Sequence, residues 1–218
     1  MALPRITVLT SGRGSNLRAL LAAERDGTLG GTISTVIGNR PDIPALDVAG
    51  AHGVPGIVIP HAAYPEREAF DAALGEAIDA SEPDLVVLAG FMRILGPELV
   101  GRYEGKMLNI HPSLLPAYPG LDTHRRALAD GVRVHGCTVH FVTAALDHGP
   151  IVAQGAVAVH DGDDEASLAA RVLAVEHRLL PAAVRAFCAG RLVIDGSRVH
   201  VKEARVPSST LEVPTSDS

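Results

Sequence analysis

The chain opens with ITVLTSGRGSNLRALLAAER, residues 6–25, and the rest of its pattern continues from this segment. Ile6 to Leu9 is a short apolar run typical of a buried strand, and it leads into the polar turn Ser11-Gly-Arg-Gly-Ser-Asn. From about Ser15 to Arg25 the apolar residues recur at the spacing of a helix. A buried strand that passes through a glycine-rich turn into a helix begins a βαβ unit, so we expect an α/β fold.

The first half of the chain repeats this order of strand and helix. Asp84 to Leu88 is almost continuously apolar, which is typical of a central parallel strand buried on both faces. Since strands separated by helices join in right-handed βαβ units, the pattern predicts an open, mostly parallel, twisted sheet with helices on both faces. The expected strands cover residues 6–9, 32–37, 56–59, 84–88 and 106–110, and the expected helices cover residues 15–25, 45–52 and 66–80.

The second half of the chain has a different pattern and predicts a mixed sheet. Three prolines, Pro112, Pro116 and Pro119, lie between His111 and Asp122, so we expect an ordered loop there. No linker interrupts the chain, so we expect one domain over residues 1–203 and a disordered, Ser-, Thr- and Pro-rich tail over residues 204–218. Further helices are expected at 123–130 and 165–188, and further strands at 136–142, 151–159, 192–194 and 198–201.

The composition limits the classes of function. The 218 residues include 19 Lys and Arg against 25 Asp and Glu, and this acidic balance argues against a nucleic-acid binder. The longest apolar run, Leu85 to Met92, is far shorter than the roughly 20 residues that a membrane-spanning helix needs. The apolar stretch at the N-terminus is too short for a secretory signal. Cys137 and Cys188 form no disulfide framework, so we expect a cytoplasmic protein with buried thiols.

The turn after the first strand is a candidate anion site. Backbone N–H groups at the start of a helix have no partner within the helix, and glycines let an anion approach them closely. The pattern Gly12-Arg-Gly-Ser-Asn is neither a dinucleotide fingerprint nor a P-loop, so it does not identify the anion. The alternative interpretation is a tight turn in which Ser15 caps the helix.

The end of the fifth expected strand carries candidate catalytic residues. In Asn109-Ile-His-Pro-Ser, strand alternation places the side chains of Asn109 and His111 on the same side of the sheet. Ligands of open α/β sheets bind at the carboxyl ends of the strands, and an amide beside an imidazole can stabilise an oxyanion and move a proton. Asp147, in the turn Leu146-Asp-His-Gly-Pro, either pairs with His111 or forms an ordinary Asx turn.

Other patterns argue against a metal site and a serine-hydrolase site. His124, His135, His140 and His148 are spaced by eleven, five and eight residues, which matches no common zinc motif, so we expect no metal. Ser15 and Ser113 lie in no G-x-S-x-G elbow, so nothing supports a nucleophilic serine.

Five segments together resemble the phosphoribosylglycinamide formyltransferases, over about residues 5 to 200. They are Ser11-Gly-Arg-Gly-Ser-Asn-Leu, Val87-Leu-Ala-Gly-Phe-Met-Arg-Ile-Leu, Asn109-Ile-His-Pro-Ser-Leu-Leu-Pro-Ala-Tyr-Pro-Gly, Gly136-Cys-Thr-Val-His-Phe-Val and Leu146-Asp-His-Gly-Pro-Ile. Five segments in the same order are far more specific than any single motif. The resemblance implies a Rossmann-like formyltransferase fold and transfer of a formyl group from the co-substrate 10-formyltetrahydrofolate to the amine of glycinamide ribonucleotide, a step of purine biosynthesis.

The resemblance also implies roles for individual residues. The catalytic group would be Asn109, His111 and Asp147, the phosphate would bind Gly14, Ser15 and Asn16, and Glu176 would bind the ribose. The folate would contact Arg67, Met92, Arg93, Ile94, Leu95, Val142, Thr143, Ala144, Ala145 and Leu146. The Leu115–Pro116 peptide bond is implied to be cis.

Three places depart from the family pattern. Ala144 and Ala145 stand where relatives often have acids, and Asp122 replaces a residue that is often His or Thr. Leu173 stands where relatives commonly place Lys or Gln near the phosphate. Since Leu173 offers neither a charge nor a donor, the amides of the loop would carry more of the phosphate binding. Arg13 would either assist them or point into water.

Other activities remain as alternatives. Methionyl-tRNA formyltransferase needs a C-terminal tRNA-binding domain and a basic surface, and formyltetrahydrofolate deformylase has an added N-terminal regulatory domain. This chain is acidic, and its first expected strand begins near residue 5. A nucleotide-binding module without catalysis fits poorly, because Asn109, His111 and Asp147 are all present. We therefore expect an enzyme that acts on small molecules, as a monomer or homodimer, without nucleic-acid or membrane partners.

Overall fold

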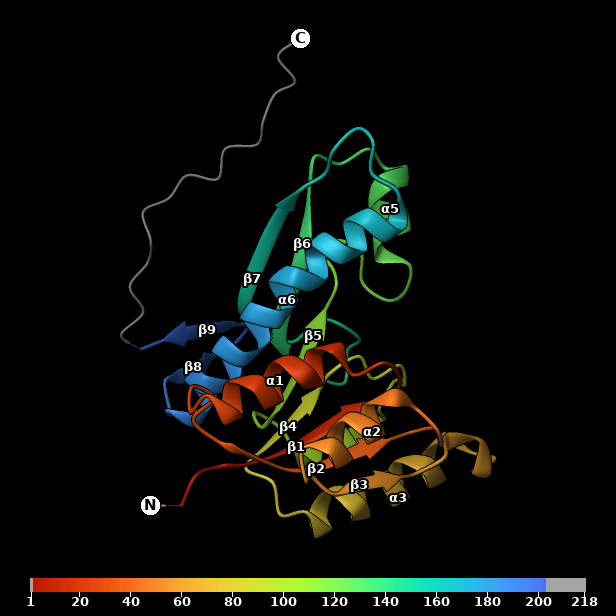
Figure 1. Ribbon diagram of the computed structural model, residues 1–218, viewed down its shortest axis with the longest axis vertical. Helices are drawn as coiled ribbons and strands as arrows, with labels where there is room; N and C mark the ends of the chain where they lie inside the picture. Colours follow the sequence, from red (N-terminus) through yellow and green to blue (C-terminus); the bar gives the residue numbers. More distant parts are fainter. Residues whose placement is uncertain (1, 203–218) are drawn as a thin grey trace.

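The computed structural model describes residues 2–202 (Figure 1). The elements in chain order are β1 (Arg5–Thr10), α1 (Ser15–Arg25), β2 (Thr32–Gly38), α2 (Pro44–Ala51), β3 (Gly56–Val58), the 3₁₀ helix η1 (His61–Ala63), α3 (Arg67–Ala80), β4 (Leu85–Leu88), α4 (Pro97–Arg102), β5 (Met107–His111), α5 (Thr123–Ala129), β6 (Val134–Phe141), β7 (Ile151–Ala158), α6 (Glu165–Cys188), β8 (Leu192–Asp195) and β9 (Arg198–Val201). The predicted tail at 204–218 lies outside the described residues.

The strands of this region form one sheet in the order β3-β2-β1-β4-β5-β6-β7-β9-β8. Neighbouring strands from β3 to β5 are parallel, whereas β6 runs antiparallel to both β5 and β7. The hairpin of β8 and β9 joins β7 through the residue pair Ile151 and Arg198. The sheet is thus open, mostly parallel and mixed in its C-terminal half, which confirms the predicted fold class.

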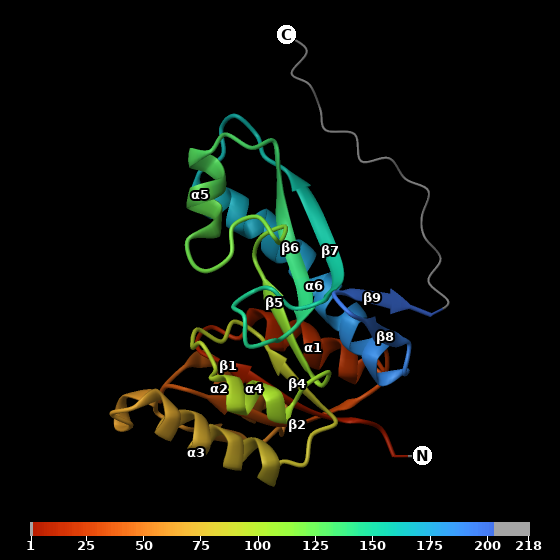
Figure 2. The same ribbon diagram turned by 180° about the vertical axis from the view of Figure 1, so that it is seen from behind.

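Helices cover both faces of the sheet. On one face, α1, α2 and α6 bury apolar side chains such as Leu20 and Val172 (Figure 1). On the other face, α3 and α4 build a second core around Phe70 (Figure 2). Successive strand residues point to opposite faces, so Val86 enters the second core and Val87 the first. This two-sided burial explains why β4 is apolar at every position.

Two local features differ from the expectations. The sequence pattern predicts no helix between residues 89 and 105, but α4 forms there, because its six residues are too few to show a helical period. Helix α1 begins at Ser15 as predicted, yet its N-cap is Gly14, with a left-handed φ of 74° and no side-chain cap. The interpretation of Ser15 as the capping residue is therefore wrong.

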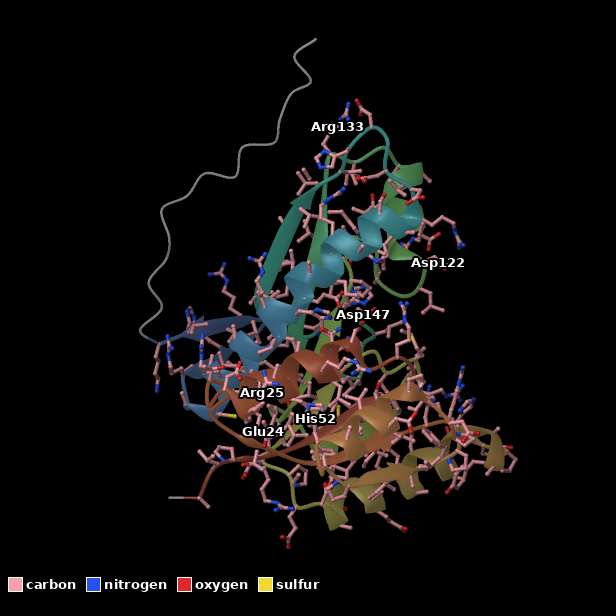
Figure 3. The ribbon with its side chains drawn as sticks, viewed as in Figure 1. Glu24, Arg25, His52, Asp122, Arg133 and Asp147 are labelled. Atoms are coloured by element: carbon pink, nitrogen blue, oxygen red, sulfur yellow. The ribbon has the colours of Figure 1, made fainter. Side chains whose placement is uncertain are left out.

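The loops that follow β4, β5 and β6 meet near Asp147, which lies close to the middle of the molecule (Figure 3). The proline-rich loop after β5 contains a cis Leu115–Pro116 bond, as the resemblance implies. Two neighbouring strands hold this loop: the N–H of Leu115 donates to Thr138 Oγ1 at 3.0 Å, and Gln154 Nε2 donates to the Leu115 carbonyl at 2.8 Å. The sheet thus fixes one wall of the site described next.

Candidate functional site

A cavity of about 400 Å³ opens at the carboxyl ends of β4 and β5. Its walls are the irregular segment after β4, the loop after β5 and the loop after β6. The lining includes Gly90, Phe91, Met92, Arg93, Ile94, Leu95, Asn109, His111, Gly120, Leu121, Asp122, Thr123, His124, His140, Val142, Thr143, Ala144, Leu146, Asp147 and Glu165. The three predicted catalytic residues and most of the predicted folate residues therefore share one cavity.

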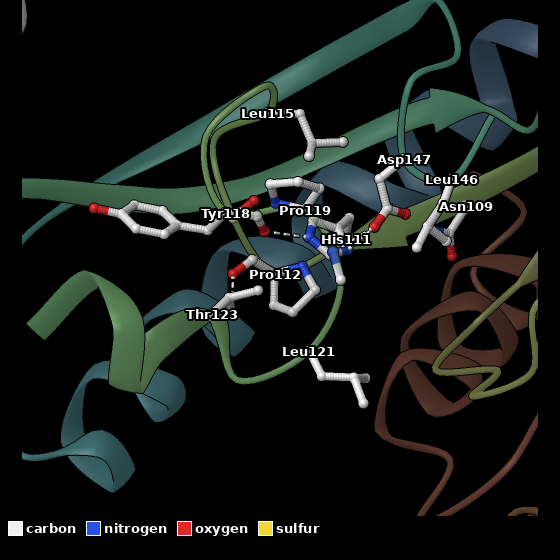
Figure 4. A network of polar contacts seen from close by, with 12 residues as sticks. Asn109, His111, Pro112, Leu115, Tyr118, Pro119, Leu121, Thr123, Leu146 and Asp147 are labelled. Carbon is white, nitrogen blue, oxygen red and sulfur yellow. Dashed lines mark hydrogen bonds and ion pairs between the residues drawn. The ribbon is translucent and has the colours of Figure 1, made fainter. Parts of the chain in front are cut away.

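His111 lies between two acceptors. Its Nε2 lies 2.9 Å from the backbone oxygen of Tyr118, so Nε2 carries a proton and donates it to that carbonyl (Figure 4). Its Nδ1 lies 3.6 Å from Oδ2 of Asp147, and both side chains are less than a tenth exposed. Nδ1 is therefore the ring atom that remains for a substrate, and the carboxylate of Asp147 stands beside it.

Asp147 is directed toward His111 by its own backbone and by a neighbouring loop. Its φ of 53° lies in the left-handed region, which Asp and Asn adopt more readily than most residues. The N–H of Gly120 donates to Asp147 Oδ2 at 2.8 Å and so ties the loop after β5 to the loop after β6. The carboxylate thus bonds across the cavity to Gly120 and lies 3.6 Å from His111 Nδ1, which is the neighbour that the pairing interpretation expects.

Asn109 is oriented by His140, which sequence reasoning considers only as a metal candidate. His140 Nδ1 lies 2.8 Å from the carbonyl of Phe141, and burial lowers the pKa of His140, so a neutral ring donates from Nδ1. Its bare Nε2 then accepts from Asn109 Nδ2 at 3.2 Å, which leaves the second amide hydrogen of Asn109 free. The two residues are direct partners in the pairing of β5 with β6, a register that local sequence does not reveal.

The segment after β4 presents backbone groups to the cavity. Met92 and Ile94 are 63% and 54% exposed, whereas Phe91 and Leu95 are buried. Within residues 2–202, the N–H and C=O groups of Arg93, Ile94 and Leu95 form no hydrogen bond to another protein group. Free donors and acceptors beside apolar side chains can bind a flat heterocycle that carries its own amide edge.

The predicted anion loop has the backbone geometry of an anion site. A Cβ at Gly14 would lie 2.9 Å from both Cα and Cβ of Ala45, so the loop passes too close to α2 for a side chain. In the described part of the chain, the N–H groups of Gly14, Ser15 and Asn16 have no backbone or side-chain partner. These groups stand at the positive end of α1, where an anion is favoured.

A buried pair lies next to this loop. Asn16 Nδ2 donates to Glu176 Oε2 at 2.7 Å, and the two residues are 7% and 6% exposed. Burial raises the pKa of Glu176, and the hydrogen bond from Asn16 partly opposes that rise. Asn16 Oδ1 is buried and has no partner among residues 2–202. The pair thus offers two acceptor groups to ligand hydroxyls.

The anion loop is separate from the cavity but joined to it. The predicted site residues outside the cavity lining are Gly14, Ser15, Asn16, Glu176, Arg67 and Ala145. Ser11 connects the two parts, because its Oγ accepts from the N–H of Met92 at 2.8 Å and its own N–H donates to Gly90 at 3.1 Å. Arg67 instead lies beside Asp71, with Nε 3.9 Å from Oδ2.

Two kinds of feature are absent between residues 2 and 202. No group of three or more His, Cys, Asp or Glu side chains is placed to hold a metal ion. No helix in that range combines the length and the apolar character that crossing a membrane requires.

Known proteins of similar sequence and structure bear on this site. The sequence profile of the formyl transferase family matches residues 4–184. A phosphoribosylglycinamide formyltransferase of Escherichia coli (strain K12) is 45% identical over 93% of this chain and 95% of its own length. The crystal structure of glycinamide ribonucleotide transformylase 1 from Symbiobacterium toebii has 50% identity and a TM-score of 0.89, with 91% of this chain and 94% of that chain covered. A formyltetrahydrofolate deformylase from Pseudomonas syringae pv. tomato is more distant, at 29% identity and a TM-score of 0.85, and 66% of that chain is covered, against 91% of this one.

Proposed function

The chain belongs to the phosphoribosylglycinamide formyltransferase family, and on this premise we propose that it transfers the formyl group of 10-formyltetrahydrofolate to the amine of glycinamide ribonucleotide. The observation that carries the proposal is the convergence of Asn109, His111 and Asp147 in one cavity. A free amide N–H and a titratable Nδ1 beside a carboxylate are the groups that acyl transfer to an amine requires.

The reaction proceeds by direct attack without a covalent enzyme intermediate. The neutral amine forms a bond to the formyl carbon, and the carbonyl electron pair moves to oxygen. The free amide hydrogen of Asn109 and the protonated Nδ1 of His111 donate to that oxyanion, while Asp147 favours the charged ring. The amine loses a proton through water toward Asp147. When the oxyanion collapses, the bond to folate N10 breaks and that nitrogen takes a proton.

The two substrates occupy the two joined parts of the site. The folate ring lies along the free backbone groups of residues 93–95 and the loop of residues 142–146. Arg67, which lies beside Asp71 outside the cavity lining, is assigned to the folate by the family resemblance alone. The phosphate of glycinamide ribonucleotide binds the amides of Gly14, Ser15 and Asn16, and Glu176 accepts from the ribose hydroxyls. The enzyme acts in the cytoplasm on these small molecules, as a monomer or a homodimer, and uses no metal.

The test is to incubate the protein with 10-formyltetrahydrofolate, with and without glycinamide ribonucleotide. We expect tetrahydrofolate to appear together with formylated ribonucleotide only when the amine substrate is present. Release of formate at the same rate without the ribonucleotide would assign the deformylase reaction instead. Formyl transfer to methionyl-tRNA but not to the ribonucleotide would assign the tRNA-dependent activity.

A further inference from the structure

The wall segment, defined as residues 90–96, connects β4 to α4 without regular secondary structure. Its middle is exposed at Met92 and Ile94, and only Phe91 and Leu95 reach the core that it shares with α3. A segment with few packed side chains and free peptide groups has little of its own to hold a single conformation. Its conformation must therefore be fixed from outside.

Two buried side chains supply that support, one at each end of the wall segment. At the start, Ser11 Oγ accepts from the N–H of Met92 at 2.8 Å. At the end, Asp71 Oδ2 accepts from the N–H of Gly96 at 2.7 Å. Ser11 is 8% exposed and Asp71 is 7% exposed; the bond to Gly96 is buried, and the bond to Met92 is partly buried. Neither residue lines the cavity.

The main contact of the Asp71 carboxylate is with the backbone of the wall segment. A Cβ at Gly96 would lie 2.7 Å from Asp71 Oδ2, so the carboxylate sits against the main chain itself. Its other oxygen is buried without a partner among residues 2–202, and Arg67 approaches no closer than 3.9 Å. Burial raises the pKa of Asp71, and the hydrogen bond from Gly96 and the charge of Arg67 partly oppose that rise. Burying an acid costs free energy, and among residues 2–202 the Gly96 bond is the one hydrogen bond that offsets this cost at Asp71.

We propose that Ser11 and Asp71 are positioning residues that hold the wall segment as one unit in the form that binds folate. We call these two residues the anchors. The identity of the ligand rests on the proposed function, whereas the support that the anchors give to the wall segment does not. Neither side chain touches the folate. Each acts on it through the backbone groups of Arg93, Ile94 and Leu95, which the anchors place between them.

The test compares removal of each anchor with its conservative replacement. Ser11→Ala and Asp71→Ala remove the acceptor, whereas Ser11→Thr keeps a hydroxyl and Asp71→Asn keeps an oxygen for the Gly96 amide. Ser81→Ala is the control for Ser11, because Ser81 is equally buried and bonds to Thr7 and Ile78 before β4 begins. Asp79→Ala is the control for Asp71, because it also links α3 to α4 but bonds to Arg102 and Tyr103.

Steady-state kinetics gives the first measurement. We expect each alanine variant at the anchors to raise KM for 10-formyltetrahydrofolate about tenfold, since it leaves one backbone donor without its acceptor. The kcat should change less than about twofold, because no group at the reacting atoms is altered. The conservative variants should restore KM, and the controls should leave it unchanged. Wild-type KM in both Ser11→Ala and Asp71→Ala would overturn the proposal.

Amide hydrogen exchange on the free protein gives a measurement that does not depend on activity. If the wall segment is one unit, Ser11→Ala raises exchange at Gly96, and Asp71→Ala raises exchange at Met92, at the end opposite each lost bond. Faster exchange only at the amide whose acceptor was removed would contradict the proposal that the wall segment behaves as one unit. A wild-type protein that transfers no formyl group would refute the proposed function, while the exchange result would still decide on the anchors.

Discussion

The catalytic group and the anion loop use different parts of the polypeptide. In the proposed catalytic group the working atoms would belong to the side chains of Asn109, His111 and Asp147, and each of these side chains bonds to a partner outside the group. In the proposed anion loop the working atoms would be backbone amides, and Gly14 lies too close to Ala45 to carry a side chain. The first region should therefore respond to changes of functional group, and the second to changes of backbone shape.

Substitutions in the catalytic group should have the largest effect. Asn109→Ala and His111→Ala should each lower kcat about 10²–10³-fold, the usual loss for one oxyanion donor. Asp147→Asn should lower it comparably, and since Asn also tolerates a left-handed φ, the thermal unfolding temperature should stay near that of the wild type. Wild-type turnover in any of the three variants would remove that residue from the mechanism.

The anion loop should instead be sensitive to added volume at Gly14. Gly14→Val brings a branched side chain against Ala45 and a left-handed φ, so KM for glycinamide ribonucleotide should rise more than about tenfold with KM for the folate unchanged. Gly27→Val is the matched control, because Gly27 has a φ of 70° with nothing within 4 Å of an added Cβ. An equal effect in the control would attribute the loss to backbone strain and not to the contact with α2.

Glu176 combines side-chain chemistry with the anion loop, and its effect on stability depends on pH. Burial raises its pKa from the ordinary 4.5, so the folded state prefers the neutral acid and ionisation opposes folding at pH 7. Glu176→Gln should therefore unfold at a higher temperature than the wild type at pH 7. The difference should shrink as pH falls toward 4.5 and below, where the wild-type acid is also neutral. A difference that grows on acidification would reverse this assignment.

The smallest effect is expected at Arg13, which is exposed beside the anion loop. Arg13→Ala should raise KM for glycinamide ribonucleotide roughly two- to fivefold, as expected for an exposed charge, and should reduce the salt dependence of binding. Arg25→Ala, at the other end of α1, should change neither quantity. An unchanged KM and salt dependence in Arg13→Ala would mean that the backbone amides bind the phosphate without this side chain.

The parallel half of the fold was largely predictable because its signals are local. The apolar run of β4 and the helical period of α1 each lie within one short segment, and the structure confirms both elements. The side-by-side placement of Asn109 and His111 follows from strand alternation alone. The proximity of Asp147 to His111 could not be predicted from local pattern alone, because it depends on a hydrogen bond between two loops.

The parts that sequence reasoning missed depend on contacts between distant segments. His140 orients Asn109 only through the register of β5 with β6. Asp71 looks like any acid on an amphipathic helix until α3 is packed against the segment before α4. Ser11 has a visible motif around it, but nothing in that motif shows that its hydroxyl reaches Met92. Neither spacing nor composition contains such information.

The free peptide groups of residues 93–95 have a consequence for resistance to inhibitors. A compound that gains affinity from a side chain can lose it through one substitution, whereas every residue except proline keeps the same backbone N–H and C=O groups. Exposed Met92 and Ile94 can therefore vary while these hydrogen-bonding groups remain. An inhibitor bonded to this stretch of main chain would leave few single substitutions by which the enzyme could escape it.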